Sequence, residues 1–461
     1  MAIDTSRKNR PALSALTVCL VAVLWLAAGP VAAMPPIQHW ETPNGARVYY
    51  VPAPQLPMVD VRIVFDAGGA RDGKAPGLAA LTNALLDQGA AGADANRVAE
   101  RFDEVGAQLD TGSLRDMAWL GLRTLTEGAL MEQAVAAFTD VLTQPDFKAN
   151  DLQRQRERML VALQLQQQKP DAVAEKAFYR ALYGDHPYGS PPEGTTESLS
   201  SLTREDVLAF YRQYYVARNA VIGIVGAVSR LEAEKLAAGI VKSLAAGRTA
   251  EPLPPVPELT ASKEVLVSFP STQTHVLMGR PGVARGDPEY FSLYVGDYIF
   301  GGGGLVSLLS QEIREQRGLS YSVYSQFIPM ARKGPFEIGL QTRNDQVEEA
   351  LGVVRDTLAR YLEEGPSEKR LEAAKKHITG GYPLRIDSNG KILQYLVSIG
   401  FYHLPIDYLE TFNARIEAVT RDDAKAAFER HVLAQRMVTV VVGGESRSSR
   451  DAANKEVAFL R

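Results

Sequence analysis

Cysteine is almost absent from this chain: Cys19 is the only one among 461 residues. It lies in an apolar stretch near the N-terminus, so the remainder of the chain has no thiol to pair. A disulfide framework is therefore excluded, and stability must come from buried apolar cores. A chain of this length is expected to form two or more domains.

A large excess of charge is also lacking, and so is a second long apolar run. The formal net charge is -4, from 50 basic and 54 acidic residues. This balance gives no reason to expect nucleic acid or an anionic membrane as the main partner. Beyond the N-terminal stretch, no window is long and apolar enough to span a bilayer. The hydrophobic content of 46% is typical of a soluble globular protein.

The N-terminal stretch has the features of a secretory signal peptide. Three basic residues open it, an apolar segment covers 15–28, and small residues suit cleavage after Ala33. An uncleaved membrane anchor is the alternative, and lipidation is disfavoured because the bulky Val18 precedes Cys19. We expect residues 1–33 to be removed. The mature chain would then lie in the bacterial periplasm without membrane attachment.

One pattern occurs twice, at an offset of 217 residues without gaps (203 to 420, and 226 to 443). The first copy begins a helical run at Thr203 and continues into the apolar segment 221–226. The second begins at Thr420 and continues into 438–443. Each threonine can cap a helix whose first turn is acidic, as the helix dipole favours. The shared order favours two homologous halves over a chance likeness of amphipathic helices.

A proline-rich segment lies between the two copies. Residues 247–263 contain four prolines, which is typical of a stiff, exposed linker. We therefore expect an N-terminal domain over 34–246 and a C-terminal domain over 264–461. Groups of strands alternate with long helices, so we expect an α+β fold in which helices cover one face of a mostly antiparallel sheet in each half. The expected strands are 47–51, 59–65, 117–124, 265–269, 274–279 and 335–342, and the expected helices are 77–88, 96–105, 130–143, 149–169, 172–183, 288–299, 305–315, 347–363 and 367–379.

The segment 77–86 (GLAALTNALL) follows an alternating apolar run and a Gly-Gly-Ala-Arg loop. In this setting it resembles the M16 (pitrilysin- and insulinase-like) zinc peptidases, which carry His-x-x-Glu-His there. The corresponding positions are Ala80, Asn83 and Ala84. A zinc helix uses His at i and i+4 because these share one face, and the Glu between them acts on the metal-bound water. Alanine has no lone pair to donate, and a neutral amide cannot accept a proton near neutral pH.

The resemblance places the third metal ligand of the family, a Glu on a later helix, at Gln164. All four functional positions are therefore replaced, which implies that this chain holds no zinc. No two of the six histidines have ligand spacing on one element. Glu157 is expected on a solvated helix face, and His186 in a turn with a satisfied imidazole.

The second half keeps a run, 312–321 (EIREQRGLSY), that resembles the M16 second-half signature. The resemblance implies that Arg314 and Tyr321, seven residues apart, reach across to the zinc-containing half and hold the substrate backbone. Both side chains donate hydrogen bonds, as a peptide carbonyl or the oxyanion formed from it requires. The alternative is a surface arginine and a half-buried strand tyrosine.

Four glycines, Gly301, Gly302, Gly303 and Gly304, precede this run. A phosphate loop is disfavoured because no Gly-Lys-Ser/Thr follows. The glycines resemble the start of the glycine-rich loop in the non-catalytic subunit of mitochondrial processing peptidase, which implies a substrate loop. A flexible hinge or close backbone packing is the alternative.

The resemblance to M16 covers about 39–444 and implies the non-catalytic, substrate-binding subunit of a heterodimeric periplasmic zinc peptidase acting on unfolded peptides. Zinc is expected in the partner, which would carry His-x-x-Glu-His, and this chain would be inactive alone. One alternative is a structural or assembly protein, like the M16-related core subunits of the mitochondrial bc1 complex. Others are a homodimeric peptide-binding clamp and an independently active peptidase with an unusual metal site.

Overall fold

The computed structural model describes residues 36–444. The predicted signal peptide, residues 1–33, lies outside the described residues. Among the helices of the described part, none is both long and apolar enough to cross a membrane.

The N-terminal half contains a six-stranded sheet in the order β1-β2-β8-β3-β7-β6. All neighbouring strands are antiparallel except β2 and β8, which are parallel. The strands are β1 (Gln38–Glu41), β2 (Arg47–Pro52), β3 (Met58–Phe65), β6 (Gln108–Ser113), β7 (Ala118–Leu125) and β8 (Ala220–Gly226), and a separate small ribbon is formed by β4 (Gly89–Ala90) and β5 (Ala93–Asp94).

The C-terminal half repeats this topology in a five-stranded sheet, in the order β11-β12-β10-β13-β9. Here β13 and β9 form the parallel pair that corresponds to β8 and β2. The predicted repeat and the α+β class are therefore confirmed. The strands are β9 (Lys263–Val267), β10 (Gln273–Pro281), β11 (Ser320–Phe327), β12 (Pro335–Arg343) and β13 (Val438–Val442).

Several helices begin at a residue whose side chain caps them. Thr203 and Thr420 form capping boxes with Asp206 and Asp423, so the two copies of the repeat start with the same local structure. The α-helices are α2 (Leu78–Ala84), α3 (Ala95–Asp103), α4 (Gly128–Thr143), α5 (Ala149–Gln167), α6 (Pro170–Tyr183), α7 (Thr196–Ser201), α8 (Arg204–Tyr214), α9 (Arg230–Val241), α10 (Tyr290–Asp297), α11 (Val347–Glu364), α12 (Glu368–Gly381), α13 (Asn389–Phe401), α14 (Tyr408–Ala418) and α15 (Arg421–His431).

Short helical turns connect these elements. The expected helix over 305–315 is wrong as an α-helix, because the chain forms a 3-10 turn followed by a π-helix there. The short segments are η1 (Gly69–Arg71), η2 (Pro187–Gly189), η3 (Ala217–Asn219), η4 (Tyr298–Gly302, π-helical), η5 (Gly304–Val306), η6 (Ser310–Glu315, π-helical), η7 (Asn344–Gln346) and η8 (Tyr382–Arg385).

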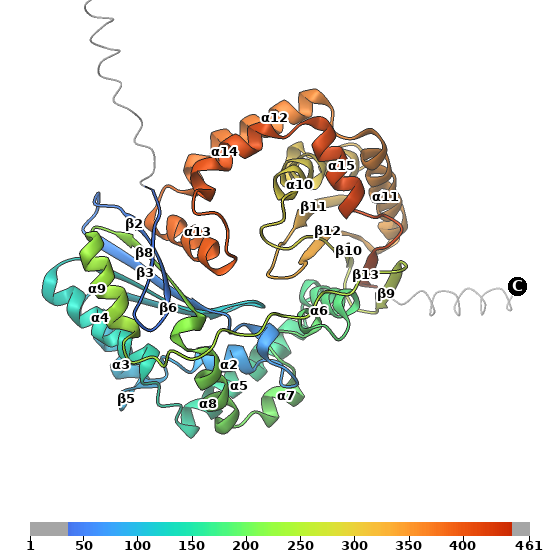
Figure 1. The fold of residues 1–461 in the computed structure, drawn as a ribbon. Coiled ribbons are helices and arrows are strands. Elements are labelled where there is room, and N and C mark those ends of the chain that lie inside the picture. The colour runs from blue at the N-terminus through green and yellow to red at the C-terminus, as the bar shows by residue number, and fades with distance from the viewer. Residues whose placement is uncertain (1–35, 445–461) are drawn as a thin grey trace, which may run out of the picture. The chain divides into compact units, whose positions relative to one another are not determined.

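Each sheet is covered on one face by helices of its own half and on the other face by a helix of the other half (Figure 1). Helix α13 packs on β8, β3 and β2, whereas α6 packs on β10 and β13. Alternation along β8 explains this: Ile222 and Ile224 belong to the N-terminal core, whereas Val221 and Gly223 face α13. The expectation of helices on one face of each sheet is thus correct but incomplete.

Two strand glycines allow these helices to come close. A Cβ on Gly223 would lie 2.8 Å from Leu393 and Val397 of α13. A Cβ on Gly279 would lie 2.9 Å from Phe178 of α6. At both positions a side chain would push the covering helix outward, so glycine sets the spacing between sheet and helix.

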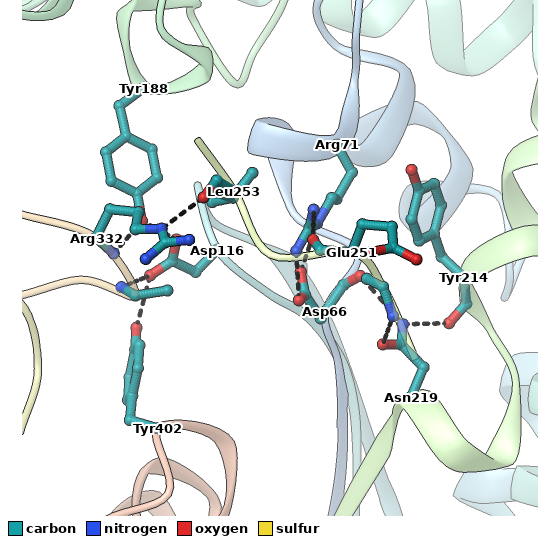
Figure 2. A network of polar contacts seen from close by, with 12 residues as sticks. Asp66, Arg71, Asp116, Tyr188, Tyr214, Asn219, Glu251, Leu253, Arg332 and Tyr402 are labelled. Carbon is teal, nitrogen blue, oxygen red and sulfur yellow. Dashed lines mark hydrogen bonds and ion pairs between the residues drawn. The ribbon is translucent and has the colours of Figure 1, made fainter. Parts of the chain in front are cut away.

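A buried carboxylate links the two halves (Figure 2). Asp116, which is 4% exposed, lies in the loop before β7. It accepts hydrogen bonds from the hydroxyl of Tyr188 at 2.6 Å, the hydroxyl of Tyr402 at 3.1 Å and the amide of Ala331 at 2.7 Å. Burial raises the pKa of Asp116, and the three donors act against that rise. One side chain thus joins two loops and the end of α13.

The segment between the halves is mostly exposed and has no regular secondary structure. It is nevertheless held at several points, since Leu253 is buried and its carbonyl accepts a hydrogen bond from Arg332 at 2.6 Å. Arg71, paired with Asp66, donates to the carbonyl of Glu251 at 2.6 Å (Figure 2). The segment therefore follows a defined path across the molecule.

Candidate functional site

Helix α2 carries the three positions that correspond to the metal motif. Leu81 points into the core and is fully buried, whereas Ala80 and Ala84 are half-buried. The carboxylate of Asp72 accepts hydrogen bonds from the first amides of the helix, Gly77 and Ala79, at 2.7 Å each. Burial raises the pKa of Asp72 to about 7. The start of the helix is thus held by Asp72, which lies outside the motif positions.

Asn83 is a buried structural link. Its amide nitrogen donates to the carbonyl of Trp119 at 3.1 Å and to the hydroxyl oxygen of Tyr215 at 3.2 Å. Only 2% of the residue is exposed. Because its donor group is directed at two acceptors, the side chain joins α2 to β7 and to the end of α8. A carboxylate in the same place could not donate to the Trp119 carbonyl.

The fourth position, Gln164, lies exposed on α5, a helix that contacts α2. The contact includes a hydrogen bond from Gln155 to the carbonyl of Ala84 at 3.0 Å. Glu157 is exposed and accepts a hydrogen bond from Gln153 at 2.7 Å, as expected for a solvated helix face. Two methyl groups and two amides do not match the nitrogen and carboxylate ligands that zinc requires, so the residues present do not fit the ion.

Elsewhere in residues 36–444, one group of side chains has ligand atoms close together: Asp287, Glu289 and His431. The carboxylate of Glu289 already has two partners. It forms an ion pair with the guanidinium of Arg430, and one of its oxygens lies within hydrogen-bond distance, 2.8 Å, of Nε2 of His431. A fixed guanidinium beside these ligands opposes a second cation, so we assign the group to an ion-pair cluster. His186 lies in a turn with both ring nitrogens hydrogen-bonded, to the Tyr188 amide and the Pro254 carbonyl.

Arg314 and Tyr321 lie together on the surface of the C-terminal half. The guanidinium carbon of Arg314 is 4.5 Å from the centroid of the Tyr321 ring. Tyr321 is 83% exposed, and Arg314 is half-buried. Within the described part of the chain, neither the guanidinium nor the hydroxyl makes a hydrogen bond or ion pair. The stacking orders both side chains while their donors stay free for another molecule.

Local backbone structure places the pair. Gly318, in a left-handed conformation at φ +63°, ends η6 and donates to the carbonyl of Arg314 at 3.1 Å. The chain then enters β11, whose pairing with β12 shifts register between Ser320 and Val323. The hydroxyl of Ser320 lies 2.7 Å from the carbonyl oxygens of both Ser322 and Gln341 and donates to them. These hydrogen bonds fix the irregular start of β11 against β12. The irregularity turns Tyr321 outward from the edge strand.

Of the four glycines where η4 ends and η5 begins, the first three pack closely against their surroundings. A Cβ on Gly301 would lie 2.3 Å from Ser325 Oγ, and one on Gly302 would lie 2.7 Å from Asp297. A Cβ on Gly303 would lie 2.5 Å from the carbonyl oxygen of Tyr298. Gly304 has a positive φ of 61°. Of the alternatives left open by the sequence, this geometry favours close backbone packing for the first three glycines.

Comparison with known proteins agrees with this architecture. Residues 47–196 match the model for insulinase (peptidase family M16), and residues 201–378 match the model for the peptidase M16 inactive domain. A solved M16 inactive-domain structure from Pseudomonas fluorescens is 39% identical, covers 89% of this chain and 98% of its own, and superimposes with a TM-score of 0.86. The chain belongs to the M16 family.

Other M16 relatives align over most of their length. An uncharacterized zinc protease of Streptomyces coelicolor is 28% identical over 81% of this chain and 83% of its own. One of Bacillus subtilis is 24% identical over 76% and 85%. A protease structure from Helicobacter pylori, at 15% identity and a TM-score of 0.83, shares the fold.

In this M16 chain a further buried carboxylate lies beneath the glycine segment. Asp297 is 7% exposed and accepts a hydrogen bond from Ser325 of β11 at 2.5 Å. Burial raises the pKa of Asp297 from its ordinary value of 3.8 to about 7, although the serine bond acts in the opposite direction. Asp297 thus connects the glycine segment to the strand that carries Tyr321.

This raised pKa predicts a defined pH dependence of stability. The folded chain binds a proton at Asp297 that the unfolded chain releases near pH 4, so this residue lowers the free energy of unfolding as pH rises from about 4 to 7. The change corresponds to at most about 4 kcal/mol. Asp297→Asn should therefore be more stable than the wild type at pH 8, with a smaller difference at pH 5. Urea denaturation at both pH values measures this, and the exposed Asp356→Asn is the matched control. A stability difference independent of pH would contradict the assignment.

Sequence reasoning did not find Asp116, Asp297 or Glu337, three buried acids of the C-terminal half and the junction between the halves. For two of them a signal exists. Asp297 ends the apolar run 290–297, and Glu337 is a single charge within the strand 335–340. A lone acid in an otherwise apolar element predicts a buried carboxylate. Asp116 follows Arg115 in a polar loop, where no such contrast exists.

Proposed function

We propose that this chain is the non-catalytic, substrate-binding subunit of a heterodimeric periplasmic M16 zinc peptidase that acts on unfolded peptides. The proposal rests on a contrast between the helix that corresponds to the metal motif and the pair of side chains in the C-terminal half. The motif helix α2 offers only methyl groups and an amide bound to its own surroundings, whereas Arg314 and Tyr321 are stacked, exposed and free to donate.

Arg314 and Tyr321 would act on a peptide held at the active site of the partner. The guanidinium presents several N–H donors and the hydroxyl presents one, and both suit a main-chain carbonyl. Their contribution grows if the carbonyl oxygen gains negative charge during cleavage, because ordered donors then need no reorganisation. The stacking contact keeps the arginine from leaving the site when no peptide is bound.

The partner would be a second M16 chain that carries His-x-x-Glu-His and holds the zinc ion. The predicted signal peptide supports a periplasmic location for this chain. No feature of the described surface requires nucleic acid or a membrane. A purely structural role is less well supported. An architectural subunit has no need for an exposed tyrosine and a stacked arginine whose hydrogen-bond donors are both free.

Co-purification tests the proposal. The tagged chain is isolated from its native host, associated proteins are sequenced, and the recombinant chains are assayed singly and mixed on an unfolded peptide. We expect an M16 chain with the intact motif, cleavage by the mixture, and about one zinc ion per partner chain by metal analysis.

Two results would overturn the proposal. Stoichiometric zinc in this chain with cleavage in the absence of a partner would show an independent peptidase. A stable complex that contains no motif-bearing chain would indicate the structural or assembly role. Measuring the size of the isolated chain with and without peptide separates both results from a homodimeric clamp.

A further inference from the structure

A cavity of about 650 Å³ lies between the sheet of the C-terminal half and the start of α6. We call it the inner-face cavity. Its floor is the face of the sheet that α6 covers at β10 and β13 but leaves open toward β12 and β11. Alternate residues of β12, from Glu337 to Gln341, and of β11, from Ser322 to Gln326, form this floor.

Acidic groups dominate the inner-face cavity. Three carboxylates line it, from Asp171, Glu175 and Glu337, against a single ammonium group from Lys169. Burial lowers the pKa of His275, which also lines the cavity, so its imidazole is neutral near pH 7. The lining therefore carries a net negative charge.

Glu337 is the deepest of these carboxylates. It is 6% exposed, and one oxygen accepts hydrogen bonds from Gln326 at 2.6 Å and Tyr324 at 3.4 Å. Its other oxygen has no partner among the described residues, and no lysine or arginine is paired with it there. Burial raises the pKa of Glu337, and the nearby charge of Glu175 raises it further. A carboxylate buried without a counter-charge is costly, so its presence favours a cationic ligand.

The hydroxyl of Tyr324 is directed to Glu337 by close packing. Tyr324 lies across Gly339, where a Cβ would be 2.4 Å from the ring. Burial raises the pKa of the Tyr324 phenol, and the charge of Glu337 raises it further, so the hydroxyl is a neutral donor. The polar groups around Glu337 are thus held in place before any ligand enters.

The inner-face cavity lies beside the stacked pair. Tyr321 immediately precedes Ser322, and Tyr324 follows three residues after Tyr321 on the same strand. Three residues of extended chain span about 10 Å. A peptide held at Tyr321 can therefore place a side chain in the cavity a few residues from the held carbonyl.

We infer that the inner-face cavity binds the side chain of a lysine or arginine in the peptide, with Glu337 as the main partner and Glu175 as the second. The unpaired oxygen of Glu337 receives the ammonium or guanidinium group. This inference rests on the proposed function and adds a substrate class to it. The substrates would be unfolded peptides with a basic residue near the peptide bond whose carbonyl Arg314 and Tyr321 bind.

Binding to the isolated full-length chain tests the inference without the partner. Fluorescence anisotropy compares labelled unfolded peptides that carry one arginine with peptides that carry citrulline, which has nearly the same shape without the charge. We expect the arginine peptide to bind about tenfold more tightly. Glu337→Gln should abolish most of this preference, and Glu175→Gln should reduce it. Glu349→Gln, on the exposed face of α11, removes the same charge outside the cavity and should leave the preference unchanged.

The pH dependence provides a second measure. Burial raises the pKa of Glu337, and it raises the pKa of Glu175 although the charge of Arg115 acts against it, so both lose charge earlier than an exposed glutamate as pH falls. Protonation of His275 acts in the same direction. The other charged groups that line the cavity are Asp171 and Lys169. The preference for arginine over citrulline should therefore decline from pH 8 to pH 5 in the wild type. In Glu337→Gln the preference should be smaller and should decline less, since only Glu175 and His275 still change their charge there.

The outcomes separate this inference from the proposed function. Equal binding of the arginine and citrulline peptides, or an undiminished preference in Glu337→Gln, overturns the inference, while cleavage by the mixed enzyme remains the test of function. Competition by free agmatine that matches the arginine peptide at equal concentration would also overturn it, because the cavity would then bind a small cation and not a peptide side chain.

Discussion

Replacing Arg314 by alanine is expected to lower turnover by the mixed peptidase by about 10²- to 10³-fold, with the two chains still associated. The guanidinium is a free donor stacked at 4.5 Å on the ring of an exposed tyrosine. Loss of one donor to a developing oxyanion typically costs about 3–4 kcal/mol. The measurement is kcat on an unfolded peptide at saturating partner concentration, together with the affinity of the two chains.

Two further variants make this result specific. Tyr321→Phe keeps the stacking ring and removes only the hydroxyl, so it should lower turnover by less than Arg314→Ala. Arg355→Ala removes an exposed arginine of α11 and should leave kcat unchanged. Unchanged kcat in both Arg314→Ala and Tyr321→Phe would refute the role assigned to the pair.

The second large effect is expected from Asp116→Ala, which should lower the free energy of unfolding by about 3 kcal/mol. The substitution leaves two tyrosine hydroxyls and the Ala331 amide without their shared acceptor in a buried setting, and each unsatisfied donor costs about 1–3 kcal/mol. Two effects oppose this loss: removal of an unfavourably buried charge, and partial reorientation of the hydroxyls. Urea denaturation at pH 7 gives the value.

Hydrogen exchange locates the effect. In Asp116→Ala the amides near Ala331 and Tyr402 should lose protection more than those of the sheet cores, because only the junction between the halves is released. Tyr402→Phe removes one donor and should cost less, about 1 kcal/mol. Asp103→Ala, at an exposed position of α3, should have little effect. Uniform loss of protection across the chain would show that Asp116 does not act at the junction.

The sequence predicted the repeat and most elements because periodicity and caps are local properties. Thr203 and Thr420 form the expected caps, and the helix and strand that follow each of them are present. The strand β6 (QLDTGS) was missed because its side chains are polar and only partly buried. Helix α13 was missed although it is apolar, and nothing in its own sequence indicates that it covers the sheet of the other half.

The candidate site was partly predictable for the same reason. The spacing of Ala80, Asn83 and Ala84 on one helix, and of Arg314 and Tyr321 across a helix end, is a matter of a few residues. The hydrogen bonds of Asn83 to Trp119 and Tyr215, and the cavity around Glu337, depend on residues tens to more than a hundred positions apart. Such contacts follow from the tertiary fold and leave no local pattern.

The reciprocal covering of the sheets by α6 and α13 has a consequence during synthesis. Helix α13 covers one face of the N-terminal sheet and ends at residue 401. While the chain leaves the ribosome, that face stays exposed until about residue 401 has emerged, long after the last strand of the sheet is complete at residue 226. Apolar residues of a nascent sheet are a known risk for aggregation. Completion of the first half is therefore a late event, and neither half is expected to survive as a separate fragment.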